Sequence, residues 1–240
     1  MYMWTDDTLQ WMMAATRHTP LYSGIASLFE DIILPESIVC DAGCGTGGLS
    51  FALAPKVRQV VAVDSDARAI KLLRKETRAK RIGNLTPICA DIFTDKVAEY
   101  FDIMVFCRFG KLEEILPTAY RYDSKKIVII KQRNKRHRFD FQQVENERCS
   151  CDMLLQQLAE ARIPYELRSG TFESGQPFTS LDDARAFFKA YAKNGGLMEF
   201  TDAQLLERVI TMENPVFPYH LPAQAELCAV ICELQPAREE

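Results

Sequence analysis

The chain of 240 residues has 29 lysines and arginines against 33 acidic residues, a net charge of -4, and 48% of its residues are hydrophobic. These values are typical of a soluble globular protein with one domain of ordinary size and an elaboration, and the acidic balance argues against a general nucleic-acid binder. No apolar run is long enough to span a bilayer, and the N-terminus lacks the basic start and apolar core of a signal peptide, so we expect a cytoplasmic protein.

Strands alternate with helices along most of the chain. Residues 5–33 are predicted to be helical with a break near Pro20. The predicted strands are 37–41, 58–64, 86–90, 101–107 and 125–131, and the predicted helices are 47–54, 66–81, 111–120 and 141–162, with a turn or short helix at 95–100. Such alternation predicts right-handed crossovers and a doubly wound α/β fold, in which helices cover both faces of a parallel sheet.

The alternation of strands and helices ends after residue 162. Residues 165–172 alternate like a strand with one exposed face, and residues 226–233 form the last predicted strand. Between them lies an insert, 173–225, in which we expect two amphipathic helices. The first is 181–194, capped by Ser180 and stopped at Gly195-Gly196, and the second is 201–212.

The eight cysteines fit the expected reducing compartment. Those in predicted strands, Cys40, Cys89, Cys107, Cys228 and Cys232, are interpreted as small apolar residues. Cys149 and Cys151 are the only close pair, and the sequence offers no nearby partners for a metal ion. We therefore expect no metal site.

A glycine-rich turn follows the first predicted strand. Gly43, Gly45 and Gly48 match G-x-G-x-x-G, and Gly47 adds a fourth glycine. Glycine permits backbone angles and a close ligand approach that a Cβ would forbid, and the following helix would direct its N-terminal amides at an anion. Taken alone, the pattern is shared with the dinucleotide-binding domains.

Asp41, two residues before the first glycine, favours a different cofactor. A carboxylate there would repel the pyrophosphate of NAD, whereas it would attract the ammonium group of S-adenosylmethionine (SAM). The run from Asp41 to Gly47, Asp-Ala-Gly-Cys-Gly-Thr-Gly, resembles the first motif of the class I SAM-dependent methyltransferases at every fixed position. A nicotinamide-dependent oxidoreductase is correspondingly disfavoured.

The resemblance implies roles for residues at three further strand ends. Asp64, about 20 residues past the turn, would hold the ribose hydroxyls, with Ser65 under the adenine. Asp91 and Ile92 would contact the adenine amine and ring, although a single Asp after a strand is more often a helix cap. The complete set of expected cofactor-binding residues is Asp41, Gly43, Cys44, Gly45, Gly47, Asp64, Ser65, Asp91, Ile92, Cys107 and Arg108.

The resemblance also implies an organisation of the chain. It covers about residues 36–172 and 226–235 in outline and implies a seven-stranded, mostly parallel sheet whose last strand is antiparallel. We expect an N-terminal helical lid at 1–35, a SAM-binding domain formed by 36–172 and 226–240, and a helical insert at 173–225 that caps the substrate.

The acceptor side of the site carries weaker indications. Methyl transfer from SAM depends mostly on positioning, and a base is needed only for a protonated acceptor. His18 and His220 are candidate bases, with His137 the weakest, although each is more often a structural residue. Tyr22 is a further weak candidate for a catalytic role or for stacking on a ligand. Trp11, with Trp4 in the same segment, is a candidate for stacking or, like Leu21, for plain helix packing.

The end of the fourth strand and the fifth strand bear on the acceptor class. Residues 107–110, Cys-Arg-Phe-Gly, lack the Pro-Pro that methyltransferases of base amines and glutamine amides often carry there. Arg108 would meet an acidic substrate or the cofactor carboxylate, and Phe109 would wall the pocket. The basic segment 131–138 is interpreted as a solvated loop, with attraction of an acidic substrate as the alternative.

The leading hypothesis is methyl transfer from SAM to an O, N, S or C nucleophile of a small molecule, with S-adenosylhomocysteine as product. A nucleic-acid methyltransferase and a non-catalytic SAM-binding subunit are the alternatives. Nucleic acid is expected to be an unlikely partner, a homodimer is left open, and the acceptor is not identified.

Overall fold

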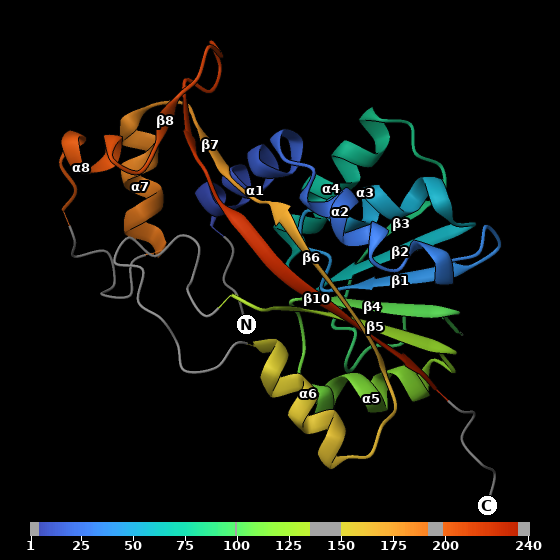
Figure 1. The fold of residues 1–240 in the computed structure, drawn as a ribbon. Helices are drawn as coiled ribbons and strands as arrows, with labels where there is room; N and C mark the ends of the chain where they lie inside the picture. The colour runs from blue at the N-terminus through green and yellow to red at the C-terminus, as the bar shows by residue number, and fades with distance from the viewer. Residues whose placement is uncertain (1–4, 99, 135–149, 192–198, 235–240) are drawn as a thin grey trace, which may run out of the picture.

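The computed structural model describes residues 5–98, 100–134, 150–191 and 199–234. A seven-stranded sheet runs through the molecule in the order β3-β2-β1-β4-β5-β10-β6 (Figure 1). Its strands are β1 (Ile38–Ala42), β2 (Gln59–Asp64), β3 (Leu85–Cys89), β4 (Ile103–Cys107), β5 (Lys126–Gln132), β6 (Glu166–Glu173) and β10 (Gln224–Glu233). The pairs among β1 to β5 are parallel, and β10 is antiparallel to β5 and β6. This arrangement confirms the predicted doubly wound sheet.

Helices cover both faces of the sheet. On one face lie α2 (Leu21–Ser27), α3 (Gly48–Leu53) and α4 (Ala67–Ala79), and on the other lie α5 (Leu112–Arg121) and α6 (Ser150–Glu160) (Figure 1). Short 3-10 turns, η1 (Glu30–Ile32) and η2 (Ala54–Lys56), complete the first layer. No helix within the described ranges is both long and apolar enough to cross a bilayer.

The start of α4 shows how local chemistry fixes these helices. Asp66 is its N-cap and accepts hydrogen bonds from the backbone amides of Arg68 and Ala69, which would otherwise lack partners. A buried stripe that includes Ile70 and Leu73 then faces the sheet, while the charged residues face outward.

The insert and α1 (Asp6–His18) form a second, smaller body, here called the cap. It contains α7 (Leu181–Tyr191), α8 (Asp202–Leu206) and a three-stranded sheet of β7 (Gln176–Phe178), β9 (Tyr219–Leu221) and β8 (Ile210–Thr211). Trp11 of α1 is buried in the cap core with its ring edge-on to Phe187, and its Nε1 donates to Asp183 Oδ1 at 2.7 Å. Trp11 is therefore a packing residue of the cap.

The N-terminal segment is shared between the two bodies. Whereas α1 belongs to the cap core, Ile25 and Ala26 of α2 are fully buried in the core of the large sheet. Gly24 lies so close to β6 that an added Cβ would come within 2.3 Å of the Phe172 ring. The connection at Thr19 and Pro20 thus joins α1 of the cap to α2, which packs on the large sheet.

The prediction of a helix over 201–212 is wrong in its second half. The helix ends at Leu206, and Ile210 and Thr211 pair instead with His220 and Tyr219 of β9. Strand pairing therefore overrides the helical periodicity here, and β-branched residues favour that outcome. The small sheet of the cap was not predicted at all. Residues 141–149 of the predicted sixth helix lie outside the described residues.

The interpretation of Cys228 as a free apolar residue is also wrong. Its sulfur forms a disulfide with Cys151, which ties α6 to the central part of β10. Both residues are buried against the sheet, so packing of α6 on β10 brings them together. Cys40, Cys44, Cys89, Cys107 and Cys232 are free.

We expect the protein, unfolded without reductant, to titrate two fewer thiols than the same protein after reduction. Because the bond closes a loop with a sequence separation of 77, reduction should lower the free energy of unfolding by about 2–4 kcal/mol. The Cys151→Ser variant should show no such stability loss on reduction. An equal thiol count in both states of the wild-type protein would contradict the bond.

Candidate cofactor and acceptor site

The glycine turn joins β1 to α3 in a conformation that requires its glycines. Gly43, Gly45 and Gly47 have φ values of +69°, +53° and +81°, in the left-handed region that side chains disfavour. The backbone amide of Gly43 donates to the Val63 carbonyl of β2 at 2.8 Å, and Gly47 is the N-cap of α3. The turn is thus anchored to two strands and opens a helix N-terminus.

Asp41 lies at the base of this turn and is 1% exposed. Its Oδ2 accepts a hydrogen bond of 2.5 Å from Ser50 Oγ of α3. Burial raises its pKa to about 6, with Asp64 adding to the increase and the Ser50 bond opposing it. A buried carboxylate whose hydrogen bonds come from one neutral residue, Ser50, has capacity for a cation, so this position fits the ammonium group of SAM.

Asp64, at the end of β2, is fixed by two backbone amides. Its Oδ2 accepts from Gly45 at 2.8 Å and its Oδ1 accepts from Asp66 at 2.9 Å. The carboxylate therefore lies directly beside the glycine turn, where the sequence predicts the ribose contact. Ser65 next to it is exposed.

Asp91 and Ile92 at the end of β3 differ in their surroundings. Asp91 Oδ1 accepts from the Phe93 amide at 2.9 Å, so the residue caps a turn and remains partly exposed. Ile92 is 2% exposed in the core beneath α5. The expectation that its side chain packs on an adenine therefore disagrees with this structure, because the core already encloses that side chain. Phe93 is the partly exposed apolar neighbour.

The turn after β4 brings an aromatic ring over the glycines. Phe109 stacks on Phe93 with a centroid distance of 5.1 Å, and a Cβ on Gly43 would come within 2.3 Å of the Phe109 ring. Lys131 holds this turn, since its Nζ donates to the Gly110 carbonyl at 2.7 Å, and burial lowers its pKa. The Phe109 ring thus lies against the glycine turn, where the sequence predicts a wall of the pocket.

Lys131 was interpreted as the start of a solvated basic loop, whereas the structure gives it this internal role. Residues 135–138 of that loop, including His137, lie outside the described residues. Cys107 and Arg108 lie beside the same turn, as predicted, and burial raises the pKa of the Cys107 thiol. Cys44 lies in the glycine turn itself, and burial raises its thiol pKa strongly. Both thiols are therefore neutral at physiological pH.

Tyr22 covers the glycine turn from the side of α2. A Cβ on Gly48 would come within 2.3 Å of its ring, and its hydroxyl lies 3.5 Å from an Arg108 guanidinium nitrogen. The hydroxyl also reaches Met12 Sδ at 3.6 Å, so Tyr22 links the turn to α1. It is a wall of the site on the N-terminal side. Trp4 lies outside the described residues.

The two candidate histidines meet in a groove of about 330 Å³ between α1 and the cap sheet. His18 Nδ1 lies 2.9 Å from the Ala14 carbonyl and must donate to it, which leaves Nε2 as the acceptor of the neutral ring. His220 Nε2 lies 3.8 Å from Glu173 Oε1. Burial lowers the pKa of His220, although Glu173 opposes this, so the ring is neutral at neutral pH.

His220 is seated on a glycine. A Cβ on Gly175 would come within 2.4 Å of His220 Nε2, so the imidazole occupies the space that a side chain at position 175 would need. Apolar side chains that include Phe217 complete the groove, and Phe217 packs edge-on to His18 at 4.5 Å. The sequence did not predict that these residues converge, because the β8–β9 pairing that brings them together carries no motif. Within the described ranges, no cluster of three or more His, Cys, Asp or Glu residues is arranged to hold a metal ion.

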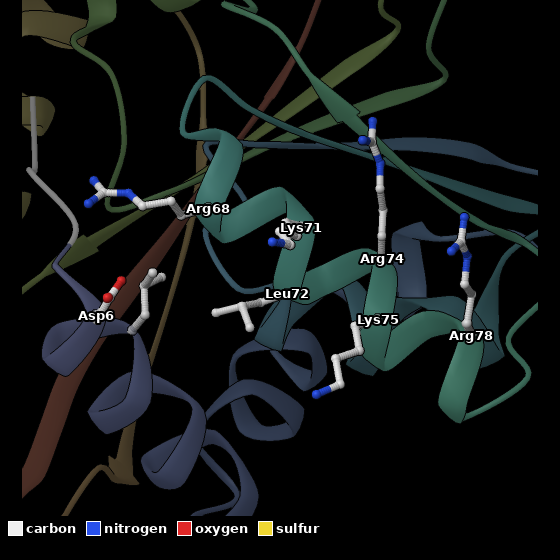
Figure 2. A pocket seen from close by; sticks show the side chains of 8 residues that line it. Asp6, Arg68, Lys71, Leu72, Arg74, Lys75 and Arg78 are labelled. Atoms are coloured by element: carbon white, nitrogen blue, oxygen red, sulfur yellow. The ribbon is translucent and has the colours of Figure 1, made fainter.

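A larger groove of about 690 Å³ lies between α1 and α4 (Figure 2). Asp6 and Leu9 line it from α1, and the remaining lining residues come from α4: Arg68, Lys71, Leu72, Arg74, Lys75 and Arg78. Its α4 wall begins at Arg68, three residues after Ser65, next to the expected ribose position.

Comparison with known proteins agrees with this geometry. A family model described as a methyltransferase domain matches residues 34–172, which is more than half of the chain. The chain is 33% identical over 67 residues to the ribosomal protein L11 methyltransferase of Thermoanaerobacter pseudethanolicus, covering 28% of this chain and 22% of that protein. It is 28% identical over 92 residues to the probable cobalt-precorrin-6B C(15)-methyltransferase (decarboxylating) of Methanobrevibacter smithii, covering 37% and 49%. In both cases less than half of the relative's length is matched.

Two solved structures share the fold. The YcgJ protein of Bacillus subtilis superposes with a TM-score of 0.55 at 13% identity, over 90% of this chain and 99% of that one. The precorrin 8W decarboxylase from Methanobacterium thermoautotrophicum gives a TM-score of 0.51 at 16% identity, over 89% of each chain.

The sheet order and the helices on both of its faces are those that the resemblance to the class I SAM-dependent methyltransferases implies. By the family match, the chain belongs to the methyltransferase-domain family.

Two residues of the site were not predicted. Ser50 stands one helical turn after Gly47, where its hydroxyl reaches back to Asp41, and a hydroxyl residue in the first turn after the motif was the available indication. Phe93, which follows Ile92, was also missed. The burial of Ile92 and the partial exposure of Phe93 depend on how the turn after β3 packs against α5, which the sequence does not show.

We expect Asp41→Asn to raise stability and to weaken SAM binding. The folded-state pKa near 6 lies above the ordinary value of 3.8, so the ionised carboxylate disfavours the folded state above pH 6, by about 3 kcal/mol at most. The variant should therefore be more stable than the wild type at pH 8, and the difference should shrink as the pH falls towards 4.

Thermal unfolding at several pH values and calorimetry with SAM would measure the two effects. We expect SAM affinity to fall by at least about tenfold, since a charge-assisted contact contributes about 1.5–3 kcal/mol. Ser50→Ala serves as the control that perturbs the same carboxylate without removing its charge. Unchanged SAM affinity in Asp41→Asn would exclude Asp41 as the ammonium partner.

Proposed function

We propose that this enzyme binds SAM across the carboxyl ends of β1, β2 and β3, and positions a small acceptor group for in-line methyl transfer. The observation that carries this proposal is the buried carboxylate of Asp41, held by Ser50 of α3, under a glycine turn that Asp64 also holds. When bound, SAM supplies a methyl group already activated by its positive sulfur.

The chain's own residues would then act mainly by positioning. Asp41 would bind the ammonium group, Asp64 the ribose hydroxyls and Asp91 the adenine amine. Phe109 and Tyr22, which flank the glycine turn, would exclude water from the reacting centre. No covalent role for a protein side chain is required.

A free small molecule is the first candidate acceptor. The groove that holds His18 and His220 has about 330 Å³, which suits one small molecule or one base-sized group. His220, neutral at neutral pH and seated on Gly175, would take the proton of a protic nucleophile at Nε2. Non-protic acceptors would need only the apolar walls.

A nucleotide within RNA is the second candidate acceptor, and the basic wall of α4 favours it. The earlier expectation that nucleic acid is an unlikely partner rested on net charge and is not supported by the relatives. One of them is the probable ribosomal RNA small subunit methyltransferase A of Methanosarcina barkeri, 26% identical over 98 residues, or 41% of this chain and 33% of that protein.

Calorimetry with SAM and with NAD tests the cofactor. We expect SAM and S-adenosylhomocysteine to bind and NAD not to bind. Asp64→Asn should weaken SAM binding by about tenfold, because it loses one charged acceptor for hydroxyl groups. Asp66→Asn is the matched control, since asparagine also caps a helix and Asp66 points to α4.

Binding of NAD with no SAM binding at millimolar concentration would overturn the proposal. Equal losses of SAM affinity in Asp64→Asn and Asp66→Asn would instead remove the ribose role of Asp64. Formation of S-adenosylhomocysteine from SAM with any added acceptor would establish turnover.

A further inference from the structure

The surface of α4 concentrates positive charge on an acidic protein. Residues 67–81 contain seven lysines and arginines and one acid, Glu76. That acid is already paired with Arg17 of α1 at 2.9 Å. The helix therefore presents a charge opposite in sign to that of the whole chain.

Five of these cations share one side of the helix. At about 100° per residue, Arg68, Lys71, Arg74, Lys75 and Arg78 fall within a sector of about 120°, opposite the buried stripe. All five are exposed. From first to last they extend about 15 Å along the helix axis, at 1.5 Å per residue. A single small anion would be met by one or two of them, whereas the full row matches a chain of phosphates.

Most of these five side chains remain available to bind an anionic ligand. Arg68 pairs with Asp66 at 2.9 Å, and Arg74 donates to the Pro87 carbonyl at 3.3 Å. For Lys71, Lys75 and Arg78, no acidic partner lies among the residues that the structure describes. Within this sector, Figure 2 shows Lys71 and Lys75 directed towards α1, and Arg74 and Arg78 extending together away from α1.

The row borders a groove that is apolar at its base. Leu72 of α4 and Leu9 of α1 both line the groove of about 690 Å³, together with the aliphatic stems of the lysines. An unpaired base has an apolar face that such a surface accepts, whereas bases in a duplex are stacked away. Single-stranded loops and ends are the usual recognition targets in RNA.

We propose that α4 and its groove form a docking surface for the phosphate backbone of single-stranded RNA. The surface begins at Arg68, four residues after Asp64, so a bound strand would run towards the expected cofactor position. The purpose of this surface, to present an acceptor nucleotide, rests on the proposed function. The binding of RNA itself requires neither SAM nor turnover.

Fluorescence anisotropy with a labelled RNA of about 20 nucleotides tests the proposal on the full chain. We expect binding at low salt. The logarithm of the association constant should fall with the logarithm of the salt concentration with a slope of about -3.5, because five single-strand phosphate contacts each contribute about 0.7. The variant Lys71→Gln/Lys75→Gln/Arg78→Gln should bind at least about tenfold more weakly at low salt and flatten the slope by about 2. Glutamine keeps the helix, since its propensity equals that of lysine.

A charge-matched control separates this surface from net charge. Lys56→Gln/Lys125→Gln/Lys189→Gln removes one cation from η2, one from the position just before β5 and one from α7, and should leave RNA affinity within about twofold. Equal weakening by both triple variants, or no RNA binding at low salt, would overturn the docking surface. Tighter binding of duplex RNA or of single-stranded DNA would overturn its assignment to single-stranded RNA.

Calorimetry with SAM on the α4 variant distinguishes the two proposals. Unchanged SAM affinity together with lost RNA affinity is the expected result. Loss of both would mean that the substitutions disturb the fold of α4, and Lys75→Gln alone would then be measured, with a slope change of about 0.7 expected. RNA binding by wild-type protein that does not bind SAM would leave the docking surface standing and remove the methyltransferase proposal.

Discussion

A buried carboxylate is the constraint on which this structure depends. Asp41 is the last residue but one of β1, an inner strand of the sheet, and is enclosed by its neighbours, with Ser50 as its hydrogen-bond partner. Such a group disfavours folding while it is ionised, and it persists where a ligand compensates it. The surrounding sheet supplies the stability that makes this tolerable, since β1 has hydrogen-bonded neighbours on both sides. The parallel topology also brings the ends of β2 and β3 to the same edge, so three acids from distant segments surround one site.

The cofactor half of the molecule was predictable because its information is local. Alternating strands and helices, the glycines with positive φ and the acid at each strand end are all visible as residue types at fixed spacing. The structure places Gly43, Asp41 and Asp64 as expected. Ile92 was the exception, since its burial depends on contact with a helix more than 20 residues away.

The cap half was less predictable because its order comes from contacts between distant segments. Trp11 is buried by a helix 170 residues later, and Ile210 becomes a strand residue by pairing with His220. The Cys151–Cys228 disulfide likewise depends on where α6 lies on β10. The net charge was also a poor guide to the local charge. Residues 67–81 carry +6 and the remaining chain carries -10, so the net value of -4 conceals a strongly basic helix.

The bond from Trp11 to Asp183 has a consequence for recombination of this fold. It makes the first helix and the insert one folding unit, although more than 150 residues separate them in the chain. A chimera that receives this insert without α1 would leave the aromatic core around Phe187 without its indole and Asp183 Oδ1 without the Trp11 donor. A chimera designed to exchange acceptor specificity between relatives therefore needs residues 5–19 as well as the insert from the same protein, with the junction at Pro20.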